Sequence, residues 1–481
     1  MTKTLIPAPT SHLRLGHART DITPPIGIYH RMWGAARHDR STGVHRPLFG
    51  EVMAFGPLTE KTPALLRAQL DLVGLVRSQH DDLVRAMAEA AGLPEARVLL
   101  TFSHTHSSGW FAPDRFGLPG GELIPPYLKS LASWLGETCR RAVAGMQESV
   151  ITYATGRCDM AANRDAYDAA FGGHVCGFNP DAPADDTLLV ARVTDTAGGL
   201  TGTFVHYACH PTTLAWENTL LSPDYVGALR EEVERTTGAP CIFLQGACGD
   251  LGPRDGFVGD TAVADRNGRQ VGFAALSALN AMGPPLTDFQ YRGPVISGAT
   301  LGTWTDAPIG DGRRKEVTRI AGGAFTLDLP LKPRLDPGSI QDDLDRWEAE
   351  QRAADRAGNA VAARDFGARA ERARRWLTRL VEIPQGPTCP LTCSVFQLGD
   401  AVWVTSGGEP YNFIQTELRR RFPDRTILFS PLASGAYVAY LLRADCYGRG
   451  LYQEEPSALA PGCLEMLTDG IEEKIRKILE E

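Results

Sequence analysis

Two histidines in the segment Ser103-His104-Thr105-His106-Ser107 have the residue type and spacing of metal ligands. The segment directly follows an apolar run at residues 98–102, which predicts a buried strand. Because side chains alternate along a strand, we expect both imidazoles to lie on one face. A His-x-His pair at a strand end can present imidazole to a metal from a rigid backbone. The alternative is a pair of surface histidines flanked by hydroxyl groups.

A second histidine motif is Cys209-His210-Pro211, at the end of the predicted strand 203–209. The chain turns at Pro211, just before a loop, so we expect the His210 side chain to belong to a functional site. His206, four residues earlier, lies within the strand. We interpret His206 as a core histidine with a satisfied hydrogen bond.

Two glycine-containing loops also follow predicted strands. The loop at residues 246–255 comes after the apolar run 241–244, and its glycines permit close approach of the backbone to another group. It is not a phosphate-binding P-loop, because it lacks Gly-Lys-Ser/Thr and an immediate helix. The alternative is a tight structural loop. Gly407-Gly408-Glu409 follows the strand at residues 402–405 and places a carboxylate where it could bind a cation.

These polar groups share one feature, which is their position at or just past the end of a predicted strand. In α/β sheets the strand ends form the crevice in which ligands bind. Two histidines, one glutamate and a tyrosine oxygen would make a four-ligand zinc site with room for substrate or water. The aromatic side chains that could line such a pocket, or equally pack in the core, are Trp33, Trp110, Phe111 and Trp216.

The elements that must position these groups alternate between strands and helices joined by short loops. This order predicts an α/β fold with mixed β-sheets flanked by helices. One of the helices is expected to begin at Ser222-Pro223, as N-cap and first residue, and to stop at Gly238.

Residues 339–380 differ from the rest, because they are rich in Ala, Arg, Asp and Glu and break at Gly358-Asn359. We expect a helical-hairpin insertion with solvated charged faces; a partner-binding arm is the alternative. Since we find no internal repeat and no low-complexity linker, we expect residues 1–481 to form a single catalytic domain that contains this insertion.

Composition excludes several classes of protein. A net charge of −8 does not favour a nucleic-acid-binding surface, and no apolar stretch reaches the roughly eighteen residues of a membrane span. The segment MTKTLIPAPTSHLRLG lacks the apolar run of a signal peptide. The ten cysteines are scattered without a Cys-x-x-Cys pair. We therefore expect a cytoplasmic protein with reduced thiols.

Seven short motifs, taken in order, resemble those of the neutral/alkaline, non-lysosomal ceramidase superfamily. They span the chain from residue 21 to about residue 461, and such an order is hard to obtain by chance. The motifs are Asp21-Ile22-Thr23-Pro24-Pro25, Thr105-His106-Ser107, Ala162-Asn163-Arg164-Asp165, Cys209-His210-Pro211, the loop 246–250, Gly408-Glu409, and the Tyr-x-x-Tyr formed by Tyr437 and Tyr440.

The resemblance implies one zinc ion per chain. Its implied ligands are His104, His210, Glu409 and Tyr440, with Tyr437 and Tyr447 close enough in sequence to compete for the last place. It also implies that His106 and Arg164 line the substrate site. An imidazole at His106 could donate to a developing oxyanion or shuttle a proton. The fork of donors at Arg164 could hold a carboxylate or carbonyl group of the substrate.

The sequence departs from the family pattern in three respects. Family members carry a C-terminal immunoglobulin-like domain and are exported, whereas this chain ends soon after Tyr440 and shows no signal peptide. We therefore expect a short, bacterial-type member. The family's proposed nucleophilic serine lies in the segment with the Gly-Asp loop, but no serine occurs between Asp224 and Leu276. We expect metal-activated water, rather than serine, to be the nucleophile.

Together these observations predict a zinc-dependent hydrolase that cleaves an amide (C–N) bond of a small or acylated substrate. Asp250 or Asp255 could orient the water or the leaving group. The alternatives are a metal-dependent esterase or lactonase with the same ligands, and a non-catalytic metal-containing binding protein on the same scaffold. A phosphoesterase is less favoured, because the His-x-His pair lacks the customary Asp-His that follows. The helical hairpin could mediate a homo-oligomer.

Overall fold

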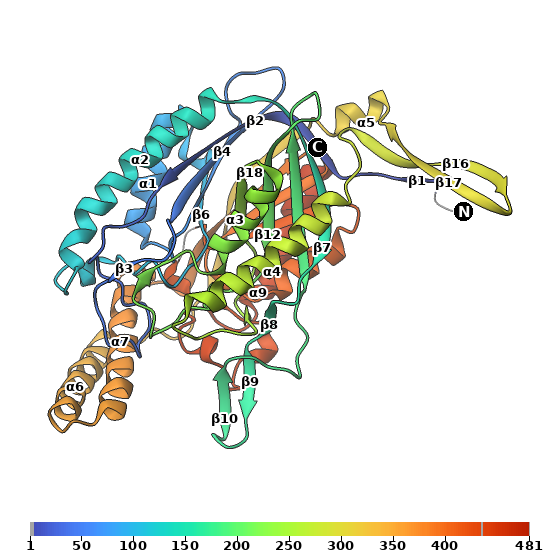
Figure 1. Ribbon diagram of the computed structural model, residues 1–481. Coiled ribbons are helices and arrows are strands. Elements are labelled where there is room, and N and C mark those ends of the chain that lie inside the picture. Colours follow the sequence, from blue (N-terminus) through green and yellow to red (C-terminus); the bar gives the residue numbers. More distant parts are fainter. Residues whose placement is uncertain (1–3, 434–435, 481) are drawn as a thin grey trace.

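An eight-stranded mixed sheet forms the centre of the computed structural model, which describes residues 4–433 and 436–480 (Figure 1). Its neighbouring strands are antiparallel, except for the parallel pairs β12–β14 and β5–β6. In spatial order the strands are β14 (Cys241–Gln245), β12 (Leu200–Tyr207), β11 (Thr187–Thr194), β7 (Gln147–Arg157), β2 (Thr10–Asp21), β4 (Phe49–Gly56), β5 (Leu65–Leu70) and β6 (Val98–Phe102).

A four-stranded sheet packs against the inner face of this central sheet. Its strands, in order, are β18 (Ile320–Pro330), β19 (Thr388–Leu398), β20 (Ala401–Ser406) and β22 (Thr426–Ser430). Trp403 of β20 lies between the two sheets, with its ring centroid 5.3 Å from that of Phe55 and 5.7 Å from that of Phe204. The apolar faces of both sheets therefore form one apolar layer of the core.

Helices cover the outer faces of both sheets. α1 (Arg77–Ala91) and α2 (Ile124–Ala144) pack on one half of the central sheet, and α3 (Tyr225–Thr237) and α4 (Thr261–Asn280) on the other. α8 (Phe413–Arg421) and α9 (Cys463–Glu480) cover the four-stranded sheet. In the two large sheets, the strands of each parallel pair are joined by a crossover that contains a helix: α1 for β5 and β6, α3 for β12 and β14, and α8 for β20 and β22. The predicted α/β fold with mixed sheets flanked by helices is confirmed.

The start of α3 differs from the expectation. Its N-cap is Asp224, whose carboxylate accepts from the backbone N–H of Tyr225 at 2.6 Å, and the helix begins at Tyr225. The Ser222 hydroxyl instead accepts from the backbone N–H of Asp224 at 2.9 Å, so it supports the cap without being the cap. The C-cap of the helix is Gly238, whose backbone is in the left-handed conformation that glycine adopts with the least strain.

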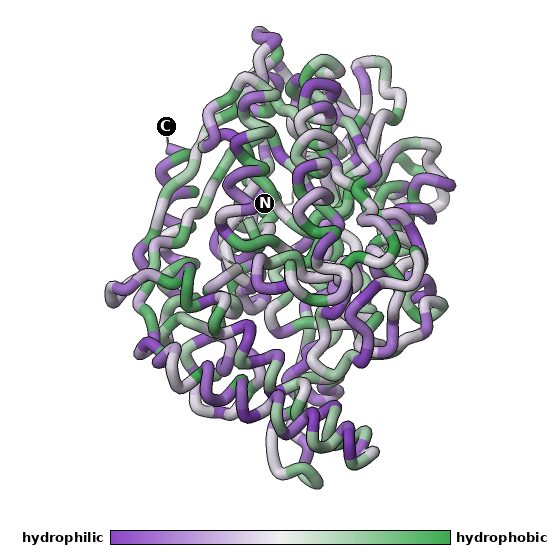
Figure 2. The backbone as a smooth tube through the Cα atoms, turned by 90° about the vertical axis from the view of Figure 1, so that its left-hand side faces the viewer, coloured by the Kyte–Doolittle hydropathy of each residue, from purple (hydrophilic) through white to green (hydrophobic). Residues whose placement is uncertain are grey.

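α6 (Pro337–Arg356) and α7 (Ala360–Glu382) form a helical hairpin that turns at Gly358. Along these helices, at the bottom of the molecule, hydrophilic and hydrophobic residues alternate (Figure 2), as expected of helices with one buried and one exposed face. The buried residues of α7 include Ala363, Ala370 and Trp376. The far end of the hairpin projects from the body, whereas Trp376 and the C-terminal half of α7 join the main core.

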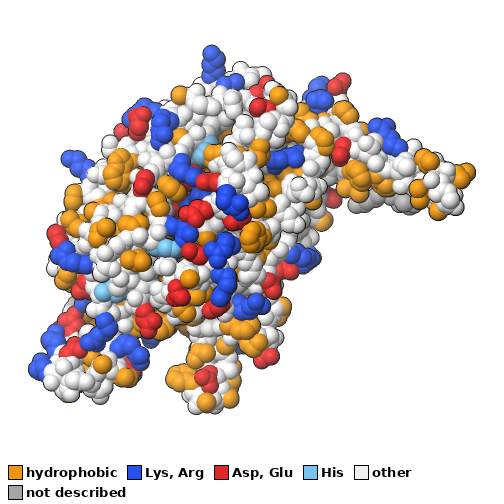
Figure 3. All heavy atoms as spheres, in the orientation of Figure 1, with side chains coloured by type: hydrophobic (Ala, Val, Ile, Leu, Met, Phe, Trp, Pro, Cys, Tyr) orange, Lys and Arg blue, Asp and Glu red, His pale blue; other side chains and the backbone are white. Residues whose placement is uncertain are grey.

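The remaining strands form small sheets at the periphery. β1, β16 and β17 make an arm that projects from the body and carries hydrophobic side chains on its surface (Figure 3). No helix in the described part of the chain is both long enough and apolar enough to span a membrane. The bounds of these elements are β1 (Leu5–Ile6), β3 (Gly43–Val44), β8 (Ala161–Asn163), β9 (Asp165–Asp168), β10 (Gly173–Cys176), β13 (Leu220–Leu221), β15 (Leu251–Pro253), β16 (Thr287–Ser297), β17 (Ala299–Pro308), β21 (Glu409–Pro410), β23 (Tyr440–Leu441) and the short helix α5 (Asp311–Glu316).

Candidate metal centre

The Glu409 carboxylate lies between two imidazoles. Its Oε2 atom is 3.4 Å from Nε2 of His104 and 3.2 Å from Nε2 of His210. Ligand atoms about 2.0–2.2 Å from a tetrahedral zinc lie about 3.3–3.6 Å apart, so this spacing is that of adjacent zinc ligands. The His210 Nε2 and Glu409 Oε2 atoms are buried and have no hydrogen-bond partner of suitable geometry among the described residues. The donor set therefore fits a metal ion.

In His104 and His210, a hydrogen bond from Nδ1 determines which ring nitrogen remains free to bind a metal. Nδ1 of His104 donates to the carbonyl oxygen of Val73, and Nδ1 of His210 donates to that of Cys248 at 2.7 Å. In the neutral form of each ring, Nε2 is then the nitrogen without a proton; both Nε2 atoms are directed at Glu409, an arrangement typical of metal-binding histidines. Burial lowers the pKa of His210 to about 3, so its imidazole is neutral at physiological pH.

His104 and His106 lie close together, but strand alternation is not the reason. β6 ends at Phe102, and His104 has a φ of 69°, in the left-handed region that non-glycine residues rarely adopt. The expectation that the period of a strand places both imidazoles on one face is therefore wrong. The turn after the strand brings their ring centroids to 4.9 Å and their Nε2 atoms to 3.4 Å. Residues held in such a conformation cluster at functional sites.

Ligand-type nitrogens of three histidines gather here. His104, His106 and His210 each offer one ring nitrogen, and these atoms lie within 4.8 Å of one another. Burial, together with the neighbouring histidines, lowers the pKa of His106 well below its usual value, so this ring is neutral as well. His106 is thus placed either to join the ligand set or to act beside it.

Tyr440 is the predicted tyrosine that lies beside the histidines. β21 and β23 pair in parallel with Glu409 opposite Tyr440, and the Tyr440 ring centroid is 6.2 Å from that of His210. Its hydroxyl accepts from the Arg164 guanidinium at 3.1 Å. The hydroxyl of Tyr447 donates to the Leu459 carbonyl, and that of Tyr437 lies against the Arg77 guanidinium.

The glycine-rich loop acts through its backbone. The carbonyl oxygen of Gly249 accepts from Nη2 of Arg164 at 2.7 Å, which fixes that guanidinium beside Tyr440. Asp250 accepts from the backbone N–H of Asn412 at 2.6 Å, and burial raises its pKa to about 6. Asp255 is exposed and forms an ion pair with Arg266. Neither aspartate is among the described residues that line the cavities next to the histidines.

Two adjoining inner cavities give access to these groups. One of about 370 Å³ is lined by His106, Arg164 and Tyr440, and a smaller one of about 70 Å³ by His104 and Glu409. The larger cavity has an aromatic wall in which the Trp33 ring centroid is 5.2 Å from that of His106. The aromatic residues of this wall are Trp33, Trp216 and Phe257.

Of the other two candidate aromatic residues, Trp110 lines the smaller cavity. Phe111 is a core residue, with its ring centroid 5.3 Å from that of Tyr127. His206 is also buried, and its Nε2 donates to the carbonyl oxygen of Phe429 at 2.7 Å. That contact agrees with the interpretation of His206 as a satisfied core histidine.

Sequence reasoning missed the contribution of α7 to this site. Arg375 and Arg379 line both inner cavities, and Arg372 lines the larger one. Their spacing of three and four residues places them on one helix face, and this spacing in the sequence could have indicated that they act together. We expect the charged faces of this hairpin to be solvated; for Arg375 and Arg379 that expectation is wrong, because they line the cavities next to the histidines, whereas Arg372 is exposed.

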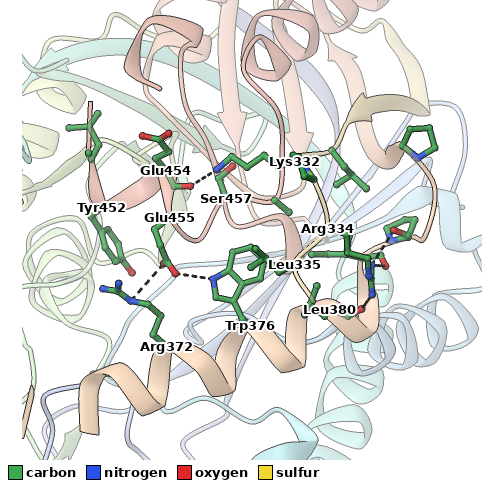
Figure 4. A pocket seen from close by; sticks show the side chains of 18 of the residues that line it. Lys332, Arg334, Leu335, Arg372, Trp376, Leu380, Tyr452, Glu454, Glu455 and Ser457 are labelled. Carbon is green, nitrogen blue, oxygen red and sulfur yellow. Dashed lines mark hydrogen bonds and ion pairs between the residues drawn. The ribbon is translucent and has the colours of Figure 1, made fainter. Parts of the chain in front are cut away.

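An outer cavity of about 1100 Å³ adjoins the larger inner one. Both are lined by Cys176, Arg372, Tyr452 and Glu455. In the outer cavity, Glu455 accepts from Nε1 of Trp376 at 2.9 Å and lies beside Arg372 (Figure 4). The apolar part of the outer lining comprises Leu331, Leu335, Trp376, Leu380 and Ile383. The outer lining also contains the charged residues Lys332, Arg334, Arg372, Glu454 and Glu455, so this cavity combines an apolar part with charged side chains.

Comparison with known proteins identifies relatives of one kind. No protein-family model matches the chain. It is 23% identical to a neutral ceramidase of Mycobacterium tuberculosis over 350 residues, which cover 65% of this chain and 53% of the relative. It is 23% identical to a neutral ceramidase of Pseudomonas aeruginosa over 249 residues, which cover 50% of this chain and 37% of the relative. The chain thus spans about half the length, or less, of these curated relatives.

Solved structures agree with this result. The crystal structure of neutral ceramidase from Pseudomonas aeruginosa superposes with a TM-score of 0.63 at 16% identity, covering 97% of this chain and 74% of that one. A structure described as ceramidase complexed with C2 gives 0.63 at 15% identity, with 96% and 74% coverage. The resemblance of this chain to the neutral ceramidase superfamily is confirmed in its sequence and in its fold.

Proposed function

We propose that this protein is a zinc-dependent hydrolase that cleaves an amide bond of an acylated substrate, with water as the nucleophile. The observation that carries the proposal is the position of Glu409 Oε2, within 3.4 Å of the Nε2 atoms of both His104 and His210. The relatives named neutral ceramidase support the class of bond.

In the proposed site, one zinc ion is held by His104, His210, Glu409 and Tyr440. Zinc bound by such a set supplies Lewis acidity, which polarises a carbonyl group and lowers the pKa of water to about 7. The Arg164 guanidinium holds the Tyr440 hydroxyl in place; burial and Glu409 raise the pKa of Tyr440, and the charge of Arg164 acts against them. The neutral His106 ring faces the larger cavity, where it can donate to an oxyanion or pass a proton to the leaving nitrogen.

Water is the proposed nucleophile because the site offers no suitable side chain. None of the described residues that line the two inner cavities is a serine. The thiol in these linings, that of Cys176, has a pKa that burial raises, and burial also raises the pKa of the loop thiol Cys248 far above its usual value. A thiol that stays protonated is a poor nucleophile.

Three further properties are part of the proposal. The chain is proposed to form one catalytic domain with the hairpin at residues 339–380 inserted in it. A cytoplasmic location is supported by the cysteines, which are all free thiols in the described structure. The apolar part of the outer cavity supports an acylated substrate, because this cavity adjoins that of the histidines and its apolar side chains can contact a hydrocarbon chain.

Metal analysis of the wild type beside His210→Ala tests the proposal. We expect about one zinc per chain in the wild type, loss of that zinc in His210→Ala, and loss of hydrolysis of an amide panel in parallel. His12→Ala is a matched control, since His12 lies outside the site and pairs with the exposed Glu148. A fully active His210→Ala protein would refute the site. Zinc binding without turnover of amides or esters would instead indicate a binding protein.

A further inference from the structure

α7 turns a row of arginines toward the candidate metal centre. Arg375 and Arg379 line the small cavity together with His104 and Glu409, and they line the larger cavity together with His106. A substrate that reaches the histidines must therefore pass close to these two guanidinium groups. The opposite wall of the larger cavity is aromatic, so the two walls differ in chemistry.

Two of the three arginines of this wall are paired with carboxylates of the protein, Arg372 with Glu455 at 3.8 Å and Arg375 with Glu371. Glu371 is shared by three arginines: its oxygens accept from Arg115 at 2.9 and 3.0 Å, from Arg375 at 2.9 Å and from Arg374 at 3.3 Å. Arg115 and Arg374 have second carboxylate partners, Asp114 at 3.4 Å and Glu348 at 2.6 Å, so Glu371 is available to balance Arg375. Arg375 also donates to the Met32 carbonyl, so its side chain is held in a fixed orientation.

Arg379 differs from its neighbours, because its guanidinium group forms no ion pair and no hydrogen bond with any described residue. Its guanidinium carbon lies 5.5 Å from the Trp376 ring centroid, and its side chain is only partly exposed. Two carboxylates lie near it, but Glu455 is bonded to Trp376 and Glu409 faces the histidines. Burial lowers the pKa of Arg379, and the nearby Tyr452, Glu455 and Glu409 offset this effect only in part. An anionic ligand in the cavity would supply the missing partner.

We propose that Arg379 binds a carboxylate of the substrate, so that the amide cleaved is an N-acylated amino acid or a related acyl amide with a free carboxylate. The inference rests on the proposed amide hydrolysis. A single uncommitted guanidinium matches a monoanion, and its fork of donors matches the two oxygens of a carboxylate. The aromatic wall and the outer cavity would then contact the apolar acyl part.

A pair of probes that differ only in charge tests this assignment. N-octanoylglycine carries the carboxylate, and N-octanoylglycinamide replaces it with a neutral group of similar size. Binding to the metal-free protein is measured by calorimetry, and octanoate release is measured with the zinc-loaded protein. The variants are Arg379→Gln and, as a matched control on the same helix, Arg364→Gln, whose side chain is exposed and pairs with Asp365.

We expect the wild type and Arg364→Gln to bind N-octanoylglycine at least about tenfold more tightly than N-octanoylglycinamide. A charge-assisted hydrogen bond increases affinity about tenfold to a hundredfold. Arg379→Gln should lose that preference while its binding of the neutral amide stays unchanged. Equal binding of the two probes by the wild type overturns the proposal. So does a preference that survives in Arg379→Gln, or failure of both probes to bind.

The two proposals fail in different ways. If the protein holds zinc and releases octanoate from both probes without a carboxylate preference, amide hydrolysis stands and the role of Arg379 is wrong. If no zinc binds and neither probe is cleaved, but the metal-free protein shows a carboxylate preference that depends on Arg379, the specificity assignment stands and the hydrolase is wrong.

Discussion

The backbone of Gly249 packs directly against the backbone of Glu409. The N–H of Gly249 donates to the carbonyl oxygen of Pro410 at 2.9 Å, and a Cβ atom added at Gly249 would lie 2.6 Å from the carbonyl oxygen of Glu409. Real Cβ atoms do not approach oxygen so closely, so only glycine fits here. The glycine-rich loop therefore sets the position of the strand that carries the central carboxylate.

Gly249→Ala should displace Glu409 and weaken metal binding. We expect zinc affinity to fall about tenfold to a hundredfold, as happens when the groups that orient a ligand are disturbed. Overpacking should also destabilise the fold by about 1–3 kcal/mol. Competition with a chelator and thermal unfolding measure the two effects. Gly177→Ala is the control, because nothing lies within 4 Å of a Cβ at that position; equal zinc affinity in both variants would contradict the role of this contact.

The variant His106→Ala tests whether His106 is a metal ligand or a residue that acts beside the metal. The proposed function places His106 outside the ligand set, so the variant should keep about one zinc. Its kcat should fall about 10²–10⁴-fold, because a proton shuttle or oxyanion donor is lost. Metal content and steady-state kinetics are measured on the same preparation. Loss of zinc would show that the three-histidine set, rather than the set with Tyr440, binds the metal.

The buried carboxylate of Glu371 predicts a pH dependence of stability. Burial alone raises its pKa, but the charges of Arg375 and Arg115 outweigh burial and lower the pKa from 4.5 to about 2. A carboxyl whose pKa is lower in the folded state stabilises the fold above its unfolded pKa, and this contribution disappears as pH falls toward 2. We therefore expect the free energy of unfolding to drop between about pH 4.5 and 2.

Glu371→Gln should remove this part of the pH dependence. At neutral pH the variant should be about 3–5 kcal/mol less stable, because it leaves buried guanidinium groups without their counter-charge. Denaturant unfolding at several pH values measures both effects. Glu137→Gln is the control, since its exposed ion pair with Arg140 should contribute less than about 1 kcal/mol. Identical pH profiles of Glu371→Gln and the wild type would disprove the assignment.

The apolar part of the outer cavity predicts that kcat/KM depends on the length of the acyl chain. Leu335 lines this cavity, and Leu335→Glu places a charge where the proposed acyl chain would lie. We expect kcat/KM for long-chain acyl amides to fall about tenfold or more, with little change for acetyl amides. Val381→Glu, at a side chain that is 87% exposed and outside the cavity, is the control. A uniform effect on all chain lengths would place the acyl chain elsewhere.

The sequence by itself determined the local features of the site. Apolar runs predicted strands that end just before His104 and His210, and the structure has β6 and β12 there. The hairpin expected at residues 339–380 corresponds to helices that span Pro337–Arg356 and Ala360–Glu382. Such features depend on residues a few positions apart, so periodicity and capping signals predict them.

How the histidines meet was not predictable from the strand-end rule. In the order of the central sheet, β6 and β12 run in opposite senses, so their carboxyl ends do not share an edge as in a parallel sheet. Neighbouring strands rotate by about 20–25°, and six such steps turn the sheet by about 120–150°. This accumulated twist is consistent with the ring centroids of His104 and His210 lying 4.8 Å apart.

Only the tertiary structure decided which charged residues face the site. Asp250 and Asp255 lie on a promising loop, yet one is bonded to the backbone of Asn412 and the other is exposed. The arginines of α7 look like a solvated face in the sequence, but the ion pair of Glu371 with Arg115, 256 residues away, turns this helix toward the histidines. Periodicity shows that a helix has a charged face; contacts between distant segments determine what that face touches.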